Sequence, residues 1–220
     1  MANVIAQALP GLRERKKQRT RATLIDAAVT LCIQQGYNNT TVEQIAAAAD
    51  VSPRTFSRYF PTKDAVMMTV LDDLVKAAAA ELATISAAVP PLTALARAHS
   101  SALRRVPSGE VSDLTTHRLV LMINVISSSS ALRLAAAAAR LLPLVIGVAA
   151  RMGLDPRDRQ VALIVSVWGA ISAGAWGQLV IGPDDYDDCA VIMADRLDQA
   201  FAEFADIAAV EVSSALSSTT

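Results

Sequence analysis

Aromatic residues, cysteines and histidines are scarce in this chain, and the small numbers of cysteines and histidines each exclude a class of protein. Only 4% of the 220 residues are aromatic, and the sequence has two cysteines and two histidines. Two cysteines cannot form the disulfide framework of a small secreted domain, and the histidines fit no common zinc motif. Cys32 and Cys189 fall on apolar helical stretches. We therefore expect buried thiols in a reducing compartment, with a redox sensor as the alternative.

Sequence motifs that would indicate an enzyme are also missing. The chain has no glycine-rich phosphate loop and no HExxH sequence, and the serines at 127–130 lack the flanking glycines of a nucleophile elbow. His117 lies on an amphipathic stretch, where a structural or surface role is the simplest interpretation. We therefore expect no catalytic residues, no metal and no cofactor.

The sequence also lacks a secretory signal, because its first charges follow its first apolar residues instead of preceding them. We therefore expect a cytoplasmic protein. The one feature that suggests a membrane is a charge-free run of 23 residues at 161–183, which is long enough to span a bilayer. Its many small residues, and the acids that follow it, favour a buried helix, so a membrane-associated helical protein is kept as the alternative.

The net charge of −1 conceals an uneven distribution of charge along the chain. Residues 1–63 carry nine basic and four acidic side chains, whereas residues 64–220 carry eleven basic and seventeen acidic ones. Six of the basic residues lie between Arg13 and Arg21. Such an asymmetry indicates a basic, nucleic-acid-facing head on an acidic body. Alone, the basic run would be interpreted as a solvated helix start. Its place just before a helix-turn-helix makes it a candidate arm that contacts phosphates or a minor groove.

Apolar residues recur at helical spacing throughout, which predicts an all-α fold. The clearest local signals lie at 40–63. The pattern Thr40 to Glu43 predicts a capping box at the start of one short helix, and Asp50 predicts a turn. Ser52 followed by Pro53 predicts the start of a second short helix. Two short helices joined by a tight turn form a helix-turn-helix, whose second helix reads the DNA major groove.

These residues resemble the DNA-binding domain of the tetracycline-repressor (TetR) family over roughly residues 19–70. The resemblance rests on a first helix ending at Gly36-Tyr37, followed by Thr40-Thr41-Val42, Ile45-Ala46, Val51-Ser52, Thr55, Tyr59-Phe60 and Lys63. Asp50 and Arg54 stand where the family often has glycine, and Ser57 and Tyr59 stand where tyrosine and histidine are common.

The resemblance implies an N-terminal three-helix helix-turn-helix domain followed by a C-terminal helical bundle for ligand binding and dimerisation. We expect a flexible basic arm at 1–18, the DNA-binding domain at 19–63, the bundle at 64–208 and a disordered tail at 209–220. Expected base contacts come from Arg54, Thr55, Ser57 and Arg58. The other residues expected at the DNA, mostly as phosphate contacts, are Thr40, Thr41, Ser52, Pro53, Tyr59 and Lys63.

The same resemblance implies a homodimer through about 156–206 that binds a palindromic operator, and a hydrophobic small-molecule effector that releases the DNA. An acyl chain, an acyl thioester or a drug-like compound would fit such a site. A constitutive DNA-binding regulator without a ligand is the alternative. The residues expected to line the ligand pocket are Leu103, His117, Leu121, Met122, Val125, Leu142, Trp168, Ile171 and Trp176, with His117, Asn124 or Gln178 as polar contacts.

Overall fold

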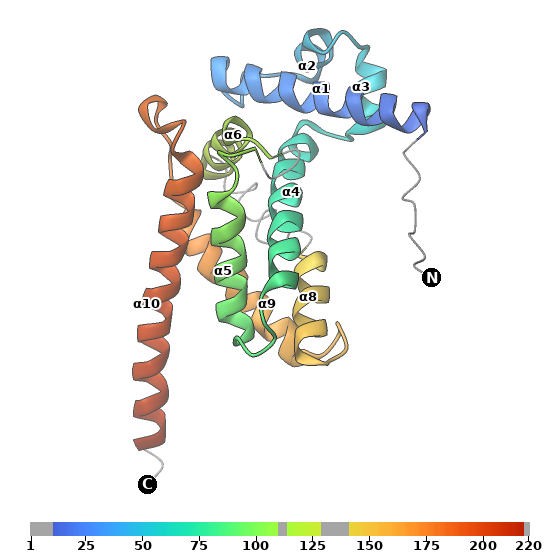
Figure 1. The fold of residues 1–220 in the computed structure, drawn as a ribbon. Helices are drawn as coiled ribbons and strands as arrows, with labels where there is room; N and C mark the ends of the chain where they lie inside the picture. The colour runs from blue at the N-terminus through green and yellow to red at the C-terminus, as the bar shows by residue number, and fades with distance from the viewer. Residues whose placement is uncertain (1–10, 110–113, 129–140, 218–220) are drawn as a thin grey trace, which may run out of the picture. The chain divides into compact units, whose positions relative to one another are not determined.

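The computed structural model describes residues 11–109, 114–128 and 141–217, and its regular elements there are helices, with no strand among these residues (Figure 1). The all-α prediction is therefore confirmed. The chain divides into two compact units, Met1–Val66 and Met67–Thr220. The boundary lies within helix α4 (Lys63–Thr84).

The first unit contains helices α1 (Leu12–Gln35), α2 (Val42–Ala48) and α3 (Pro53–Tyr59). The predicted capping box exists, but one residue further along the chain. Thr41 is the N-cap of α2, and its hydroxyl accepts the backbone N–H of Gln44, whose side chain accepts the N–H of Thr41. Thr40 is buried instead, and its hydroxyl donates to the carbonyl of Gly36 at 2.9 Å. The shift follows from α1, whose last turn already engages Thr40.

The turn between α2 and α3 follows the sequence signals closely. Asp50 adopts a left-handed conformation with φ 52°, which a short polar residue tolerates. The hydroxyl of Ser52 then accepts the N–H of Thr55 at 3.1 Å, and Pro53 occupies the first turn of α3. Phe56 and Phe60 face inward with ring centroids 5.9 Å apart, so the opposite face of α3 points outward.

The second unit consists of the remainder of α4 and of α5 (Pro91–Arg104), α6 (Thr116–Ser128), α8 (Leu142–Met152), α9 (Arg159–Trp176) and α10 (Cys189–Ser217). Helix α5 packs against both α9 and α10. Ser100 and Arg104 of α5 bond to Asp198 of α10, each at 2.9 Å. Because α5 is apolar toward the bundle and polar toward these acids, its position is set on both sides.

The structure corrects two predicted chain ends. Helix α1 begins at Leu12, so residues 12–18 are helical and not a flexible arm, while residues 1–10 lie outside the described part. Helix α10 continues to Ser217, through most of the predicted disordered tail, and begins at Cys189 after a short 3-10 turn at Pro183–Asp185. In α1 the difference arises because helix-favouring arginine, lysine, glutamate and glutamine precede the apolar stripe used to place the boundary. The valines and serines of the tail are weaker helix formers, and propensity does not explain their helical structure.

Helix α9 covers only part of the charge-free run at 161–183. It ends at Trp176, and residues 179–182 are not helical, so the charge-free run does not form one continuous helix. Among the described helices, none has the combination of length and apolar character needed to cross a membrane.

Helix α8 holds the end of α4 through one arginine. Arg151 donates to the carbonyls of Ile85 at 3.0 Å and Val89 at 3.1 Å, and also to that of Ser86. These carbonyls lie just past the last turn of α4, where intrahelical donors are lacking. The cation also lies at the negative end of the helix dipole, so the contact stabilises the end of α4. Pro143 lies in the first turn of α8, where its missing N–H leaves no intrahelical hydrogen bond unmade.

A histidine stands in the apolar interior of the second unit. His99 of α5 is 4% exposed, and its Nδ1 lies 3.0 Å from the carbonyl of Leu95, so Nδ1 carries the proton. The indole N–H of Trp168 donates to Nε2 at 3.5 Å, which again requires the neutral imidazole. Burial lowers the pKa of His99 to about 4.

This lowered pKa predicts an acid-sensitive stability. In the unfolded chain the imidazole takes up a proton near pH 6.5, whereas in the folded chain it stays neutral until about pH 4. The contribution of His99 is therefore fully present above pH 6.5 and is lost as the pH falls toward 4. Relative to His99→Gln, the wild type should lose about 2 kcal/mol of unfolding free energy between pH 7 and pH 5.

Urea unfolding followed by circular dichroism at several pH values would measure this difference. The exposed His117 and the carboxylates are common to both proteins, so subtraction removes their contribution. A wild-type minus variant difference that stays flat from pH 7 to pH 5 would show that His99 is not held neutral by the fold.

Candidate nucleic-acid interface and buried cavity

The outer face of α3 presents the side chains that the sequence predicts for DNA reading. Arg54, Ser57 and Arg58 are exposed, while Thr55 and Tyr59 are half-buried. The hydroxyl of Ser57 donates to the carbonyl of Pro53 at 3.1 Å, and the guanidinium of Arg58 lies 5.3 Å from the ring centre of Tyr59. The structure therefore brings the predicted residues of α3 onto one surface, with Arg54 at its N-terminal end.

The residues predicted to hold phosphates are placed less uniformly. Thr41 and Ser52 lie on the surface as the caps of α2 and α3, where backbone N–H groups and the helix dipole favour an anion. Thr40 is only 2% exposed, and its hydroxyl is bonded to the carbonyl of Gly36, so its side chain is not accessible to a phosphate.

Lys63 also has a role that the sequence did not suggest. Its ammonium donates to the carbonyls of Tyr37 at 2.5 Å and Thr40 at 2.8 Å, and lies 3.9 Å from the ring centre of Tyr37. The hydroxyl of Tyr37 in turn donates to Asp64, and burial together with this carboxylate raises the pKa of Tyr37. Lys63 was expected to bind phosphate, but here it fastens the α1–α2 turn to the start of α4.

A groove with four basic side chains in its wall runs between the first turns of α1 and the outer face of α3. Thr55, Arg58 and Tyr59 lie on the α3 side, with Val51 before them. The α1 side is made by Gly11, Arg13, Glu14, Lys16, Lys17 and Thr20. With four cations and one acid, the groove carries positive charge on both walls. Arg15 and Arg19 lie on the same helix but do not line the groove.

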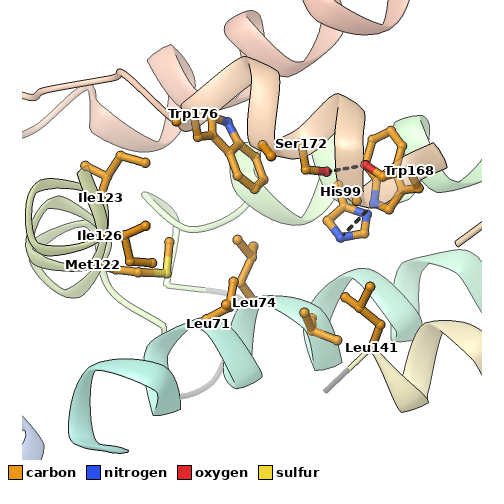
Figure 2. A pocket seen from close by; sticks show the side chains of 14 residues that line it. Leu71, Leu74, His99, Met122, Ile123, Ile126, Leu141, Trp168, Ser172 and Trp176 are labelled. Atoms are coloured by element: carbon orange, nitrogen blue, oxygen red, sulfur yellow. Dashed lines mark hydrogen bonds between the residues drawn. The ribbon is translucent and has the colours of Figure 1, made fainter. Parts of the chain in front are cut away.

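The second unit contains a cavity of about 160 Å³ between α4, α5, α6 and α9 (Figure 2). Its wall is mostly aliphatic and aromatic, with His99, Trp168 and Trp176 as the ring-bearing residues. The remaining described lining residues are Leu71, Leu74, Val75, Met122, Ile123, Ile126, Leu141, Gly169, Ser172, Ala173 and Gly177. Ser172 donates to the carbonyl of Trp168 at 3.0 Å, and Trp176 donates to the carbonyl of Met193 at 3.0 Å.

Only part of the predicted ligand-binding set lines this cavity. Met122, Trp168 and Trp176 do. Among the others, Leu103, Leu121, Val125 and Ile171 are buried but pack elsewhere, while His117 and Leu142 are exposed. Of the polar candidates, Asn124 donates to the carbonyl of Ile181 and accepts the N–H of Ile181 through its side-chain amide. Gln178 is exposed.

The main residue that sequence reasoning missed is His99. A signal for it existed, because His99 follows Leu95 by four residues and precedes Leu103 by four, which places it on the apolar stripe of α5. The lining residues of α4 and the small residues of α9 carry no such signal, since core positions and cavity positions share the same helical spacing.

Comparisons with known proteins agree with this geometry. Residues 24–68 match the family model described as bacterial regulatory proteins, tetR family. The chain is 46% identical to the HTH-type transcriptional regulator TcmR of Streptomyces glaucescens over 102 residues, which cover 46% of this chain and 45% of TcmR. It is 39% identical over 49 residues to YuxN of Bacillus subtilis, an uncharacterized HTH-type transcriptional regulator, covering 22% and 17% of the two chains. The chain thus matches less than half the length of these relatives.

Solved structures with a similar chain course include FadR of Thermus thermophilus, a TetR-family repressor in complex with lauroyl-CoA. It is 21% identical with a TM-score of 0.44, and the match covers 82% of this chain and 91% of that one. A regulator from Marinobacter aquaeolei is 16% identical with a TM-score of 0.42, covering 83% and 97%. The match at 24–68 covers the capped turn and the exposed face of α3, so the similarity to the tetR family of bacterial regulatory proteins lies in the first unit.

Proposed function

We propose that this protein is a transcriptional repressor that binds a palindromic operator as a homodimer and is released by a small apolar ligand. The observation that carries the proposal is the outer face of α3, where a Ser52 cap and Pro53 start a short helix that exposes Arg54, Ser57 and Arg58. A helix of this kind enters the major groove with its N-terminal residues at the base edges.

Within this interface, different side chains have different roles. Arg54 is fully on the surface at the N-terminal end of α3, and an arginine there can bond the O6 and N7 atoms of one guanine. Thr55, Ser57 and Arg58 are the remaining candidates for base edges. Thr41 and Ser52 offer helix N-termini to phosphates, and such contacts set the register of the protein on DNA without reading sequence.

The basic groove between α1 and α3 extends this interface. A groove with cations on both walls fits one polyanionic sugar–phosphate strand, because each wall neutralises phosphates from one side. The helical first turns of α1 thus replace the flexible arm expected from the sequence.

Dimerisation through α9 and α10 is supported by apolar side chains left on their surfaces. Leu163 of α9 is 63% exposed, and Ile207 and Val210 of α10 are 62% and 65% exposed. Helices α9 and α10 contact each other, and large apolar side chains exposed on two such helices are consistent with an interface between subunits. A two-fold dimer presents two copies of α3 to the two halves of a palindrome.

Replacing Arg54 by alanine tests the reading role of α3. The variant should lose about 1–3 kcal/mol of affinity for the preferred DNA and much less for unrelated DNA, because only the preferred site offers the lost base contact. The duplex would be the tightest binder selected from a random-sequence library, and fluorescence anisotropy would give the affinities.

Arg97→Ala, which removes an exposed arginine from α5, is the control and should leave both affinities unchanged. If the variant lost equal affinity for the selected and the unrelated duplexes, Arg54 would contact phosphates and not bases. A wild-type protein that enriches no sequence and binds no duplex at low salt would overturn the DNA-binding proposal itself.

A salt series tests the basic groove. The double variant Lys16→Ala, Lys17→Ala should flatten the slope of log K against log salt by about 1.8, since each lost phosphate contact removes about 0.9. The matched control Arg15→Ala, Arg19→Ala removes the same charge from the same helix outside the groove, and its slope should stay near the wild-type value. Equal changes in the two double variants would mean that α1 acts only through its overall charge.

A further inference from the structure

The cavity of the second unit has a wall made almost entirely of apolar side chains. Its described lining residues include no charged side chain. Helices α4 and α6 contribute only aliphatic side chains and a methionine, whereas α5 and α9 contribute the rings of His99, Trp168 and Trp176 (Figure 2). Such a wall gives dispersion contacts everywhere and a flat aromatic surface on one side.

The polar atoms of this wall already bond to the protein. The imidazole of His99 donates from Nδ1 to Leu95 and accepts at Nε2 from Trp168, so neither nitrogen is left for a ligand. Ser172 donates its hydroxyl proton to the carbonyl of Trp168 at 3.0 Å, and the indole of Trp176 donates to Met193. An anionic group entering the cavity would therefore lose its hydration without gaining a hydrogen-bond donor among these residues. A cationic group would find no carboxylate in the described wall, so both are strongly unfavourable there.

The size of the cavity narrows the ligand further. A dry protein cavity of about 150 Å³ lined by aliphatic and aromatic residues takes up benzene, and the cavity here measures about 160 Å³. The sulfur of Met122 and the indole of Trp176 both make favourable contacts with an aromatic ring.

We propose that the cavity binds an uncharged, apolar molecule of about the size of one aromatic ring, and that this class of compound is the effector. That such a compound acts as the effector rests on the proposed ligand-released regulator. That it binds in the cavity does not depend on that proposal. It also differs from the acyl chains and acyl thioesters expected from the sequence, because a carboxylate or phosphate would find no cation in the described wall.

Intrinsic fluorescence gives a direct test, because Trp168 and Trp176 are the only tryptophans of the chain and both line the cavity. The full-length protein would be titrated at pH 7.5 with toluene, with its carboxylate and ammonium analogues benzoate and benzylammonium, and with dodecanoate as the long-chain probe. Toluene should change the emission saturably, and each charged probe should bind at least about tenfold more weakly. The proposal would be overturned if benzoate or dodecanoate bound more tightly than toluene, or if toluene gave no response up to its solubility limit in water.

A matched pair of variants ties the response to this cavity. Ser172→Leu fills the cavity from α9 and should abolish the toluene response, whereas Ser166→Leu makes the same change at an exposed position of the same helix and should not alter it. If Ser172→Leu fails to fold, Ile126→Phe fills the same space from α6. An unchanged response in the folded filling variant would place toluene elsewhere and overturn the assignment.

The titration requires no DNA, so the two proposals can fail separately. Saturable toluene binding by a protein that selects no DNA sequence would leave the cavity assignment standing and remove the regulator. A protein that selects DNA but responds only to charged or long-chain probes would do the reverse. If toluene binds and also lowers the affinity for the selected duplex, both are supported.

Discussion

The DNA-binding proposal depends on one local constraint, the capped turn that starts α3. Asp50 accepts a left-handed backbone, the hydroxyl of Ser52 satisfies the N–H of Thr55, and Pro53 needs no hydrogen bond at its nitrogen. These three residues set where the helix begins. The inward Phe56 then decides which face is buried, and by exclusion which side chains can meet DNA.

A second group of contacts stabilises the first unit by joining the segment between α1 and α2 to the start of α4. Lys63 bonds two carbonyls of the segment between α1 and α2, and Tyr37 bonds Asp64. A lysine at a helix N-terminus opposes the helix dipole, which suggested a role toward phosphate. The structure shows that two backbone carbonyls in the segment between α1 and α2 satisfy the same cation. The oxygen acceptors that the ammonium meets are therefore backbone carbonyls of the protein itself.

The second unit is organised around α5, which packs against both α9 and α10. Its apolar side carries His99 toward α9, and its polar side reaches the acids of α10. The cavity lies where the large rings of α9 and the aliphatic residues of α4 and α6 leave space between them. Because the polar atoms of its wall bond to other groups of the protein, the cavity is suited to contact with an apolar surface and not to ionic recognition.

The sequence by itself determined the all-α class, the position of the helix-turn-helix and the face of α3, because caps, prolines and helical spacing act within a few residues. It placed the capping box one residue early and missed the helical extension of α1. Only the tertiary structure decided that Lys63 meets carbonyls, that His99 and not His117 lies at the cavity, and that just three of the nine expected lining residues reach it. Those outcomes depend on which side chains from distant helices meet, and periodicity alone does not distinguish a packed core position from one that borders a void.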